Sequence, residues 1–524
     1  MTVQVIKDSR AIAMKDMPWT KDLEAACECT IEWQETASSS WGQQKQASLA
    51  AGDVADVTIG GYSNSDWGDY SSLFLDLTPE LKDMPNLSKV FEKASFSRVV
   101  STWEDKIYGG PGVMLGTMAS SSSHMFINKQ WLDKLGLAVP TTWDEMETVL
   151  EAFKTGDPNG NGQADEIPLD FNAPSTDGWG AFQPNVLVGS KGIPVTGGGI
   201  GMYADNGTIK NYLTDPAYKE FIQYTRDLWS KGLISKEAFT HDWSQYTSTA
   251  KGEGTTAKVG MSWMWTPSDL FGTQLADQYI TIPQLKAEPG QSEKTKWAFN
   301  GDAINYQSNK VSISADVKNK AAALKLVDSM YTADIGVQMR YGAFDVGVKK
   351  NGENNYTVLD PADTSKNLSD WQFMNSLADG APGWVTQPGV TLTIPAQFAE
   401  VRGVDAVYNA DFANMDLNKD VIYGGASFTA DESKQYSLNN TGITQAVMSK
   451  FAQWVTKGGV EDEWDAYVAD LERNKLGDQI KLQQQAYDRF LKVMAENDVD
   501  LNTELTDPGL VWTDNNDGSA TLSR

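Results

Sequence analysis

Histidine and cysteine are nearly absent from this sequence, which contains two of each in 524 residues. His124 and His241 lie far apart, so the chain has neither an HExxH pair nor the His/Cys cluster of a zinc enzyme. Cys27 and Cys29 stand two positions apart in CECTIEW, a segment that predicts a strand with both side chains on one face. Because a bridge over so short a span is geometrically poor, we expect two small core residues, not a redox or metal pair.

The motifs of nucleophilic catalysis and of phosphate binding are also missing. The sequence contains no GxSxG, no GxxxxGK[ST] and no GxGxxG, and its glycine runs at 109–112 and 197–201 lack a strand-to-helix context. These absences do not exclude a glycoside hydrolase that uses two carboxylates, because 70 acidic residues allow many such pairs.

Basic residues are scarce relative to acidic ones: 43 Lys and Arg stand against 70 Asp and Glu, which gives a net charge of −27. Such a charge argues against nucleic acid and anionic membranes as partners, because polyanions attract basic surfaces. No apolar run approaches the roughly 18 residues of a spanning helix. The N-terminus lacks the apolar core of a secretory signal, so the protein is either cytoplasmic or has lost a signal segment.

Tryptophan, normally the rarest aromatic residue, is abundant: the sequence has 18 Trp, 18 Tyr and 18 Phe. Sugar rings stack their C–H faces on indoles, so this excess favours a carbohydrate site, although most of the indoles are expected in the core. The apolar fraction of 40% indicates a folded globular chain. Its length allows three or four domains or two large lobes.

Strand patterns alternate with helix patterns over the first 330 residues, which predicts α/β architecture. One predicted helix follows the capping box Thr142-x-x-Glu145, and another follows Asp215 with Pro216 in its first turn. Residues 443–497 predict three helices, and the polar tail after them is expected to pack loosely. The predicted strands are Cys27–Trp33, Ala55–Ile59, His124–Asn128, Lys258–Trp263, Tyr279–Ile282 and Lys310–Ser314.

The sharpest local motif is GDPNGNGQADEIPL at 156–169. Oxygen-bearing side chains at alternate positions, with Gly162 at the sixth, resemble the first half of an EF-hand loop. The motif departs from that loop at its twelfth position, where Pro168 replaces the bidentate Glu. We predict a structural Ca²⁺ site rather than an empty Asn-Gly turn. The predicted ligands are Asp157, Asn159, Asn161, Gln163 (through its carbonyl), Asp165 and Glu166.

These features together resemble the extracellular solute-binding proteins of ABC sugar importers, above all the large oligosaccharide- and alginate-binding branch. The resemblance is close over residues from about 25 to about 360 and weaker over the helical remainder. It is carried by the run at 125–169 together with ADVTIGGY (55–62), DLTPEL (76–81), WEDKIYGGP (103–111), KVGMSWMW (258–265) and YGAFDVGVKKNGENNYTVLD (341–360).

The resemblance implies a two-lobed α/β fold of the periplasmic-binding-protein type, with a hinge, a ligand cleft and a calcium loop in the second lobe. We expect lobe 1 to comprise 1–140 and about 301–360, and lobe 2 about 141–300 and 361–524, including a helical region at 441–497. It also implies an extracellular or periplasmic monomer that delivers its ligand to permease subunits. Members carry a lipid anchor on an N-terminal cysteine, so we expect this sequence to begin after it.

Binding without catalysis requires aromatic platforms and planar polar groups, so the candidate sugar contacts are aromatic and amide or carboxylate residues near loop or strand ends. Since no cluster of Lys or Arg lies beside them, we expect a neutral oligosaccharide. The candidates are Asn64, Trp67, Trp179, Trp243, Trp265, Trp297, Asn300, Asp302 and Trp384.

Two alternatives to a transport-binding protein stay open at this point. One is a glycoside hydrolase or lyase with two carboxylates in the cleft, which would shorten labelled oligosaccharides that a binding protein returns intact. The other is a surface adhesin or sensor that shares the fold but serves no permease.

Overall fold

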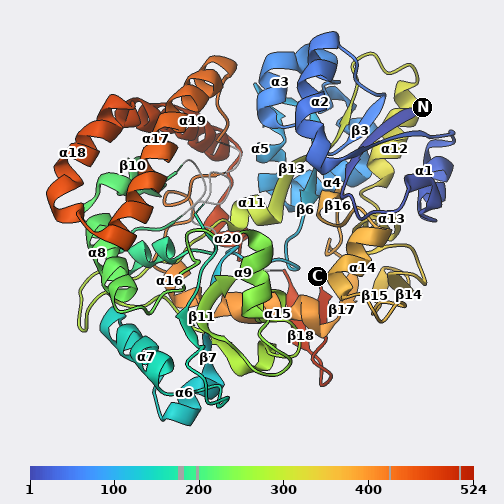
Figure 1. Cartoon of the computed structure of the whole chain (residues 1–524). Coiled ribbons are helices and arrows are strands. Elements are labelled where there is room, and N and C mark those ends of the chain that lie inside the picture. Colours follow the sequence, from blue (N-terminus) through green and yellow to red (C-terminus); the bar gives the residue numbers. More distant parts are fainter. Residues whose placement is uncertain (175–181, 196–199, 424–425, 507–508) are drawn as a thin grey trace.

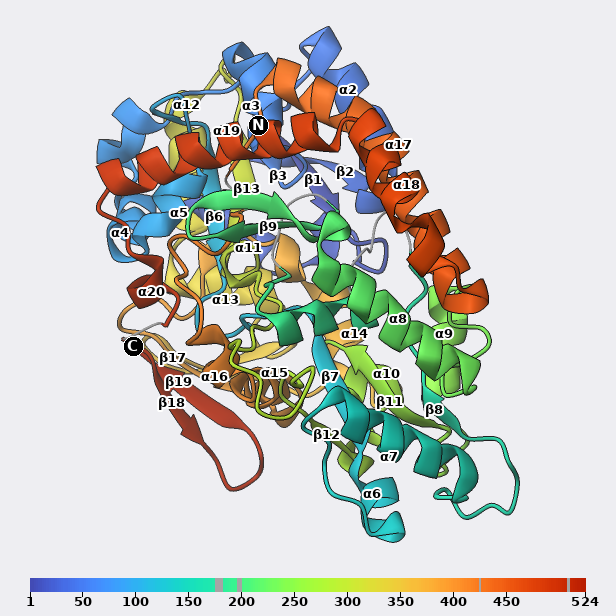
Figure 2. The same cartoon turned by 90° about the vertical axis from the view of Figure 1, so that its left-hand side faces the viewer.

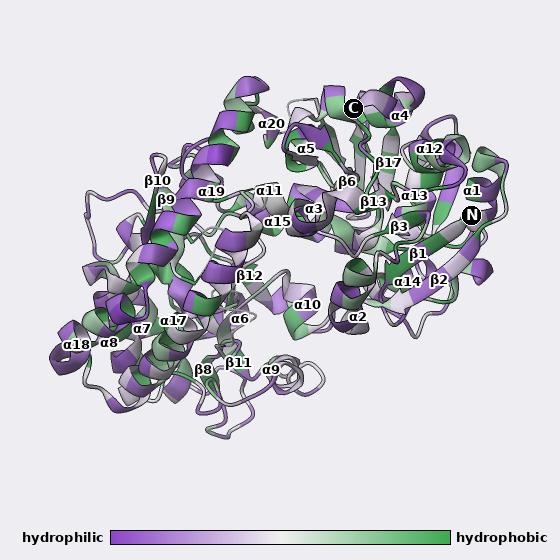
Figure 3. Cartoon of the chain, turned by 90° about the horizontal axis from the view of Figure 1, so that it is seen from above, coloured by the Kyte–Doolittle hydropathy of each residue, from purple (hydrophilic) through white to green (hydrophobic). Residues whose placement is uncertain are grey.

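The computed structural model describes residues 1–174, 182–195, 200–423, 426–506 and 509–524. Two α/β lobes lie side by side, one containing the N-terminal residues and the other containing most of the long C-terminal helices (Figure 1). Seen from above, the peripheral helices carry alternating hydrophilic and hydrophobic bands (Figure 3). Such banding is expected where each helix buries one stripe against a sheet or another helix.

Lobe 1 is built on a six-stranded sheet in which β1 pairs in parallel with β2 and β3, while β13 runs antiparallel to β3 and β6. The sheet order is β16 (Gly383–Trp384), β6 (Gly109–Val113), β13 (Tyr306–Ile313), β3 (Val57–Ile59), β1 (Thr2–Lys7), β2 (Glu32–Ala37). Its helices are α1 (Thr20–Cys27), α2 (Ser38–Ala51), α3 (Asn64–Tyr70), α4 (Pro85–Lys93), α5 (Ser95–Val100), α12 (Lys320–Ser329), α13 (Ala333–Tyr341) and α14 (Leu368–Asn375).

Lobe 2 contains a four-stranded sheet in the order β12 (Tyr279–Thr281), β7 (His124–Asn128), β11 (Val259–Met264), β8 (Ile167–Leu169). Every residue of β7 and β11 is buried. Strands covered on both faces have continuous apolar runs, which explains why both were predicted within one residue of their observed ends. The predicted starts of β3 and β13 were less accurate, by two and four residues.

The two lobe-2 helices begin where the sequence predicts, but the capping box at Thr142 is only half formed, because the Glu145 carboxylate accepts the Thr141 amide and not the Thr142 amide. In α7 (Trp143–Thr155), the Thr142 side chain accepts the Glu145 amide at 3.3 Å, and the stripe through Met146, Val149 and Phe153 is buried. In α8 (Pro216–Ser230), the Asp215 carboxylate accepts the Ala217 amide at 2.8 Å. An N-cap acceptor satisfies one of the amides that the first helical turn leaves unpaired.

The C-terminal region confirms three helices: α17 (Ala430–Lys457), α18 (Val460–Arg473) and α19 (Leu476–Glu496). Both α17 and α18 pack on α8 of lobe 2, while α17 also contacts α3 and α19 contacts α5 of lobe 1. Figure 2 shows these helices along one side of the molecule. These helices therefore contact both lobes.

The polar tail does not pack loosely, contrary to the sequence-based expectation. Residues 511–514 and 520–523 form β18 (Val511–Asp514) and β19 (Ala520–Ser523), and β19 pairs with β17 (Thr391–Ile394). They belong to a five-stranded sheet in the order β14 (Val348–Gly352), β15 (Asn355–Val358), β17, β19, β18. Ala520 and Leu522 are buried in its core, so alternate apolar residues in a short polar segment were sufficient to form a strand.

The prediction for the two cysteines was wrong. Cys27 ends helix α1, the strand begins only at Glu32, and Cys27 is bonded to Cys29 in a disulfide. The intervening Glu28 has a φ of 53°, and its amide donates to the Ala25 carbonyl. This left-handed turn at the helix end brings the two Cα atoms to 5.2 Å, which is within the normal range for a disulfide.

The lobe boundaries, judged by the sheet that each strand joins, differ from the boundaries expected from the sequence. The strand β7 at 124–128 belongs to the lobe-2 sheet, and β16 at 383–384 belongs to the lobe-1 sheet. The chain passes from lobe 1 to lobe 2 between β6 and β7, and returns between β12 and β13. It passes again through α15 (Ala396–Ala406) and α16 (Asn409–Phe412), and returns through α20 (Leu501–Glu504) to the five-stranded sheet.

Candidate functional site

Three of these crossing segments are bonded to one another. The Asp405 carboxylate on α15 accepts the amides of Ser120 and Ser121, on the segment after β6, at 2.8 and 3.0 Å. Asn300, on the segment before β13, accepts the Ser122 amide at 2.9 Å and donates to the Ser122 hydroxyl at 3.0 Å. We call this set of contacts between 120–125, 297–300 and 405–408 the hinge cluster.

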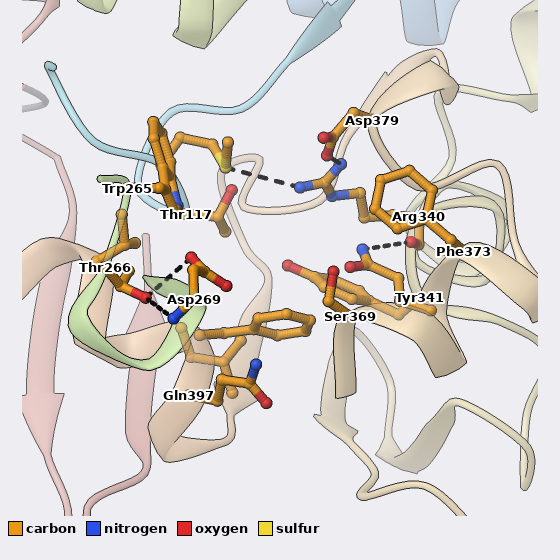
Figure 4. Close-up of a pocket in the computed structure, with 15 residues that line it drawn as sticks. Thr117, Trp265, Thr266, Asp269, Arg340, Tyr341, Ser369, Phe373, Asp379 and Gln397 are labelled. Carbon is orange, nitrogen blue, oxygen red and sulfur yellow. Dashed lines mark hydrogen bonds and ion pairs between the residues drawn. The ribbon is translucent and has the colours of Figure 1, made fainter. Parts of the chain in front are cut away.

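A groove between the lobes opens beside the hinge cluster (Figure 4). Trp265, Thr266 and Asp269 contribute from the end of β11 and from α10 (Pro267–Phe271), while α13 and α14 contribute opposite them. The cavity has a volume of about 130 Å³ and adjoins a second of about 460 Å³ that shares Asp269, Ser369 and Gln397. The residues facing Trp265 across the groove are Arg340, Tyr341, Ser369, Gln372, Phe373 and Asp379.

The groove has a paired charge on its lobe-1 side. The Arg340 guanidinium forms an ion pair with Asp379, and its attraction lowers the pKa of that carboxyl group. The Arg340 Nε atom is buried and has no hydrogen-bond partner among the described residues. On the lobe-2 side, burial raises the pKa of Asp269, whose Oδ2 accepts the Thr266 hydroxyl at 2.9 Å. The groove therefore offers planar donors and acceptors with little unpaired charge.

Two of the predicted sugar contacts have accessible rings. Trp265 is half-buried and lines the groove. Trp243 begins α9 (Trp243–Ala250), is 48% exposed and lies 5.8 Å from the Phe182 ring. Trp179 lies outside the described residues, and so does the side chain of Asp302.

Trp67, Trp384 and Asn64 lie in the lobe-1 core. Trp67 is 0% exposed and packs against Tyr108, and Trp384 is 2% exposed with its Nε1 donating to Thr386 at 3.0 Å. Asn64 donates to the Val100 carbonyl at 3.1 Å and accepts from Asn309 at 2.9 Å. Because no ring face of either tryptophan is open to a ligand, we assign them packing roles instead of the predicted sugar contacts.

Trp297 and Asn300 belong to the hinge cluster and not to the groove. Trp297 is 0% exposed, stacks on Tyr408 with 4.1 Å between ring centroids, and donates from Nε1 to the Ser123 carbonyl at 2.8 Å. Both polar ends of the Asn300 side chain are bonded to Ser122. Both residues connect crossing segments, which explains why they stand at loop ends without facing a ligand.

The sequence analysis missed Arg340, Asp379 and Phe373 of the groove. Arg340 lies on α13, Phe373 on α14 and Asp379 in the turn after α14. The pattern of apolar residues in a helix does not distinguish a position that faces a groove from one on the outer surface. One face of the Phe373 ring is covered by the Arg10 guanidinium, 4.2 Å from the ring centroid. An arginine and an aromatic residue more than 300 positions apart give no local signal of that contact.

The predicted calcium loop folds as a compact turn. The Asp157 carboxylate accepts the amides of Gly160 at 3.0 Å and Gly162 at 3.2 Å, and Asn159 and Asn161 donate to the Asp165 carboxylate. Glu166 Oε1 is buried without a hydrogen-bond partner among the described residues, and burial raises the pKa of this carboxyl group. As the loop lies in this structure, no three or more His, Cys, Asp or Glu side chains among the same described residues are grouped in an arrangement that holds a metal.

A buried carboxyl group, that of Asp170, lies directly after strand β8 of lobe 2. Burial raises the pKa of Asp170 to about 7, while burial lowers the pKa of His241, whose Nδ1 is 4.0 Å from Asp170. A carboxyl group whose pKa is raised by folding stabilises the protein at low pH, and this contribution is lost as the pH rises towards 7. Asp170 therefore makes the folded protein less stable at neutral than at mildly acidic pH.

The comparisons with known proteins agree with this geometry. The family model of bacterial extracellular solute-binding proteins matches residues 15–336. A solved HMO-binding, ABC-transporter-associated solute-binding protein from Bifidobacterium longum infantis is 37% identical, with a TM-score of 0.88. That match covers 94% of this chain and 98% of the other.

A second relative is the fructooligosaccharide ABC transporter substrate-binding protein FusA of Streptococcus pneumoniae. It is 28% identical over 88% of this chain and 84% of its own length. Its structure in complex with kestose has a TM-score of 0.78 at 25% identity, covering 94% of this chain and 99% of that one. An EF-hand mutant of FusA has also been solved, with fructo-nystose bound.

These relatives are described as binding proteins and not as enzymes. No helix within the described part of the chain is long and apolar enough to cross a membrane. The family model covers more than half of the sequence, and the two-lobed fold is the fold of the matched structure. The chain belongs to the bacterial extracellular solute-binding protein family.

Proposed function

We propose that this protein binds a neutral oligosaccharide in the groove between its lobes and delivers it to the permease subunits of an ABC importer. The observation that supports this most is the placement of Trp265, which lies opposite Arg340, Asp379 and Phe373 across the groove. An indole beside paired planar polar groups is suited to stacking one face of a sugar ring while its hydroxyls are bound.

A neutral ligand is favoured because the guanidinium in the groove is already paired with a carboxylate. The cavity of about 130 Å³ is smaller than the roughly 300–1,000 Å³ of typical ligand pockets. The adjoining space of about 460 Å³ provides room for further sugar units. We propose that the lobes open to admit the ligand and close around it, as hinged binding proteins do.

We also propose that the loop at 157–166 holds a structural Ca²⁺. The fit is supported by Glu166 Oε1, an acceptor that is buried without a hydrogen-bond partner among the described residues, and by the all-oxygen donor set. Asp157, Asn159, Asn161, Asp165 and Glu166 would hold the ion through their side chains, and Gln163 through its carbonyl. A bound cation would offset the repulsion between the three carboxylates and tie the end of α7 to β8.

The Trp265→Ala variant is expected to weaken oligosaccharide binding while the fold is kept. Truncation of a central aromatic contact costs about 2 kcal/mol or more, which corresponds to a loss of about 30-fold or more in affinity. Calorimetric titration with kestose and with human milk oligosaccharides measures this loss. Trp512→Ala, on edge strand β18, is the matched control and should bind like the parent. Equal affinity of parent and Trp265→Ala for every sugar bound would show that the groove is misplaced.

A further inference from the structure

One tryptophan presents its ring to solvent at the start of α9. Trp243 is 48% exposed, whereas every other tryptophan among the residues that the structure describes is buried or half-buried. A single exposed apolar side chain is common on protein surfaces. The surroundings of Trp243 are less common, because a second aromatic ring and a fixed helix start hold the indole in one place.

The second ring belongs to Phe182, whose backbone is strained. The Phe182 and Trp243 ring centroids are 5.8 Å apart, with 40° between the ring planes. The φ angle of Phe182 is 58°, in the left-handed region that a bulky residue rarely adopts, and its carbonyl accepts the Asn172 amide at 3.1 Å. Strain of this kind gathers at ligand sites, where the surrounding structure maintains it.

The start of α9 fixes the indole from the other side. Asp242 Oδ1 accepts the Gln245 amide at 2.8 Å, and Gln245 Oε1 accepts the Asp242 amide at 2.9 Å, which completes a capping box. One turn later, the buried Tyr246 ring lies 5.9 Å from the Trp243 ring. A ring that is already held in position loses little conformational entropy when a ligand stacks on it.

Tyr246 also connects this surface to the side of the groove that carries Trp265. Its hydroxyl donates to the Trp263 carbonyl at 2.6 Å, and Trp263 precedes Trp265 by two residues at the end of β11. This chain of contacts spans at most about 20 Å, since an extended chain advances roughly 3.5 Å per residue. Helix α9 packs on α10 and lies on the side of lobe 2 that faces lobe 1 (Figures 1 and 3).

We infer that Trp243 and Phe182 form an outer sugar-binding platform, which holds one unit of an oligosaccharide whose other units occupy the groove beside Trp265. Because the platform extends that groove, it rests on the proposed function, and it adds a requirement for ligand length. The face of an indole is suited to the C–H face of a sugar ring. Two contacts joined through one ligand raise the affinity only for a ligand long enough to reach both.

The length requirement is tested by calorimetric titration with two series of sugars of increasing length. One series is kestose, nystose and longer inulin-type fructooligosaccharides, and the other is lacto-N-triose, lacto-N-tetraose and lacto-N-hexaose. We expect the parent to bind the longer members of at least one series more tightly than the shortest member. Trp243→Ala should lose about tenfold in affinity for those longer members and nothing for the shortest, whereas Trp243→Phe should keep most of the affinity.

The matched control is Gln245→Ala, which removes one hydrogen bond of the capping box without changing the indole. It should keep the length dependence of the parent. The inference is overturned if Trp243→Ala weakens every sugar equally, if it weakens none, or if Gln245→Ala reproduces its effect. Failure of the proposed groove site would appear separately, as an unchanged affinity of Trp265→Ala for the shortest sugar. Absence of binding to every member by the parent would overturn the proposed function and the outer platform together.

Discussion

Trp297→Ala is expected to lower the free energy of unfolding by about 3–5 kcal/mol, the range for truncating a buried tryptophan. The indole is 0% exposed and stacks on Tyr408 at 4.1 Å within the hinge cluster. Its removal leaves a cavity and deprives the Ser123 carbonyl of the hydrogen bond from Nε1. Chemical denaturation followed by circular dichroism should show the loss as a lower midpoint.

Two control variants show whether the loss of stability is specific to the buried indole. Trp243→Ala removes an indole that is 48% exposed and should change stability by no more than about 0.5 kcal/mol. Trp297→Phe keeps an aromatic ring against Tyr408 and should lose less stability than Trp297→Ala. If Trp297→Ala were as stable as the parent but bound sugar more weakly, Trp297 would be a sugar contact, as the sequence analysis predicted, and the packing role would be wrong.

Removal of the calcium ion that we propose at 157–166 is expected to lower the melting temperature substantially. An ion that binds only the folded state stabilises it by RT ln(1 + [L]/Kd), about 2.7 kcal/mol at a hundredfold excess over Kd. Chelator should therefore lower the melting temperature in differential scanning calorimetry. Added Ca²⁺ should restore it better than Mg²⁺, because the smaller ion prefers an octahedral shell that retains water.

The matched variants for this experiment lie in two acidic turns. Asp157→Ala should abolish the response to chelator, because its carboxylate organises the loop through Gly160 and Gly162. Asp517→Ala, in the polar turn between β18 and β19, should leave the response intact. The proposal is contradicted if elemental analysis of protein purified without chelator finds no calcium and melting is indifferent to chelator.

The elements that could be predicted from the sequence are those with local causes. The capping residues Thr142 and Asp215 begin α7 and α8 where expected, and the apolar runs of β7 and β11 fix those strands. Each signal depends on neighbouring residues alone. The prediction for the cysteine pair was wrong because it treated the segment as a strand. The left-handed turn at Glu28 belongs to the end of helix α1, and a strand pattern does not predict such a turn.

The groove could not be predicted to the same degree, because its sides are brought together only by tertiary packing. Trp265 and Trp297 both stand near loop ends in the sequence, yet one lines the groove and the other is enclosed by three crossing segments. Asp379, in the turn after α14, forms an ion pair with Arg340 of α13. Nothing in the sequence near either residue marks it as part of the groove. An abundance of tryptophan indicates a class of ligand but not which indoles face it.

The central claim is that the two lobes bind an oligosaccharide and return it unchanged. Small-angle scattering on calcium-replete protein, with kestose and human milk oligosaccharides added in turn, tests it most directly when the sugar is recovered and analysed by chromatography. We predict that at least one sugar lowers the radius of gyration in a saturable way, because ligand favours the closed state, and that it is recovered intact. Shortened sugar products, or an unchanged radius with a sugar shown to be bound, would contradict the account.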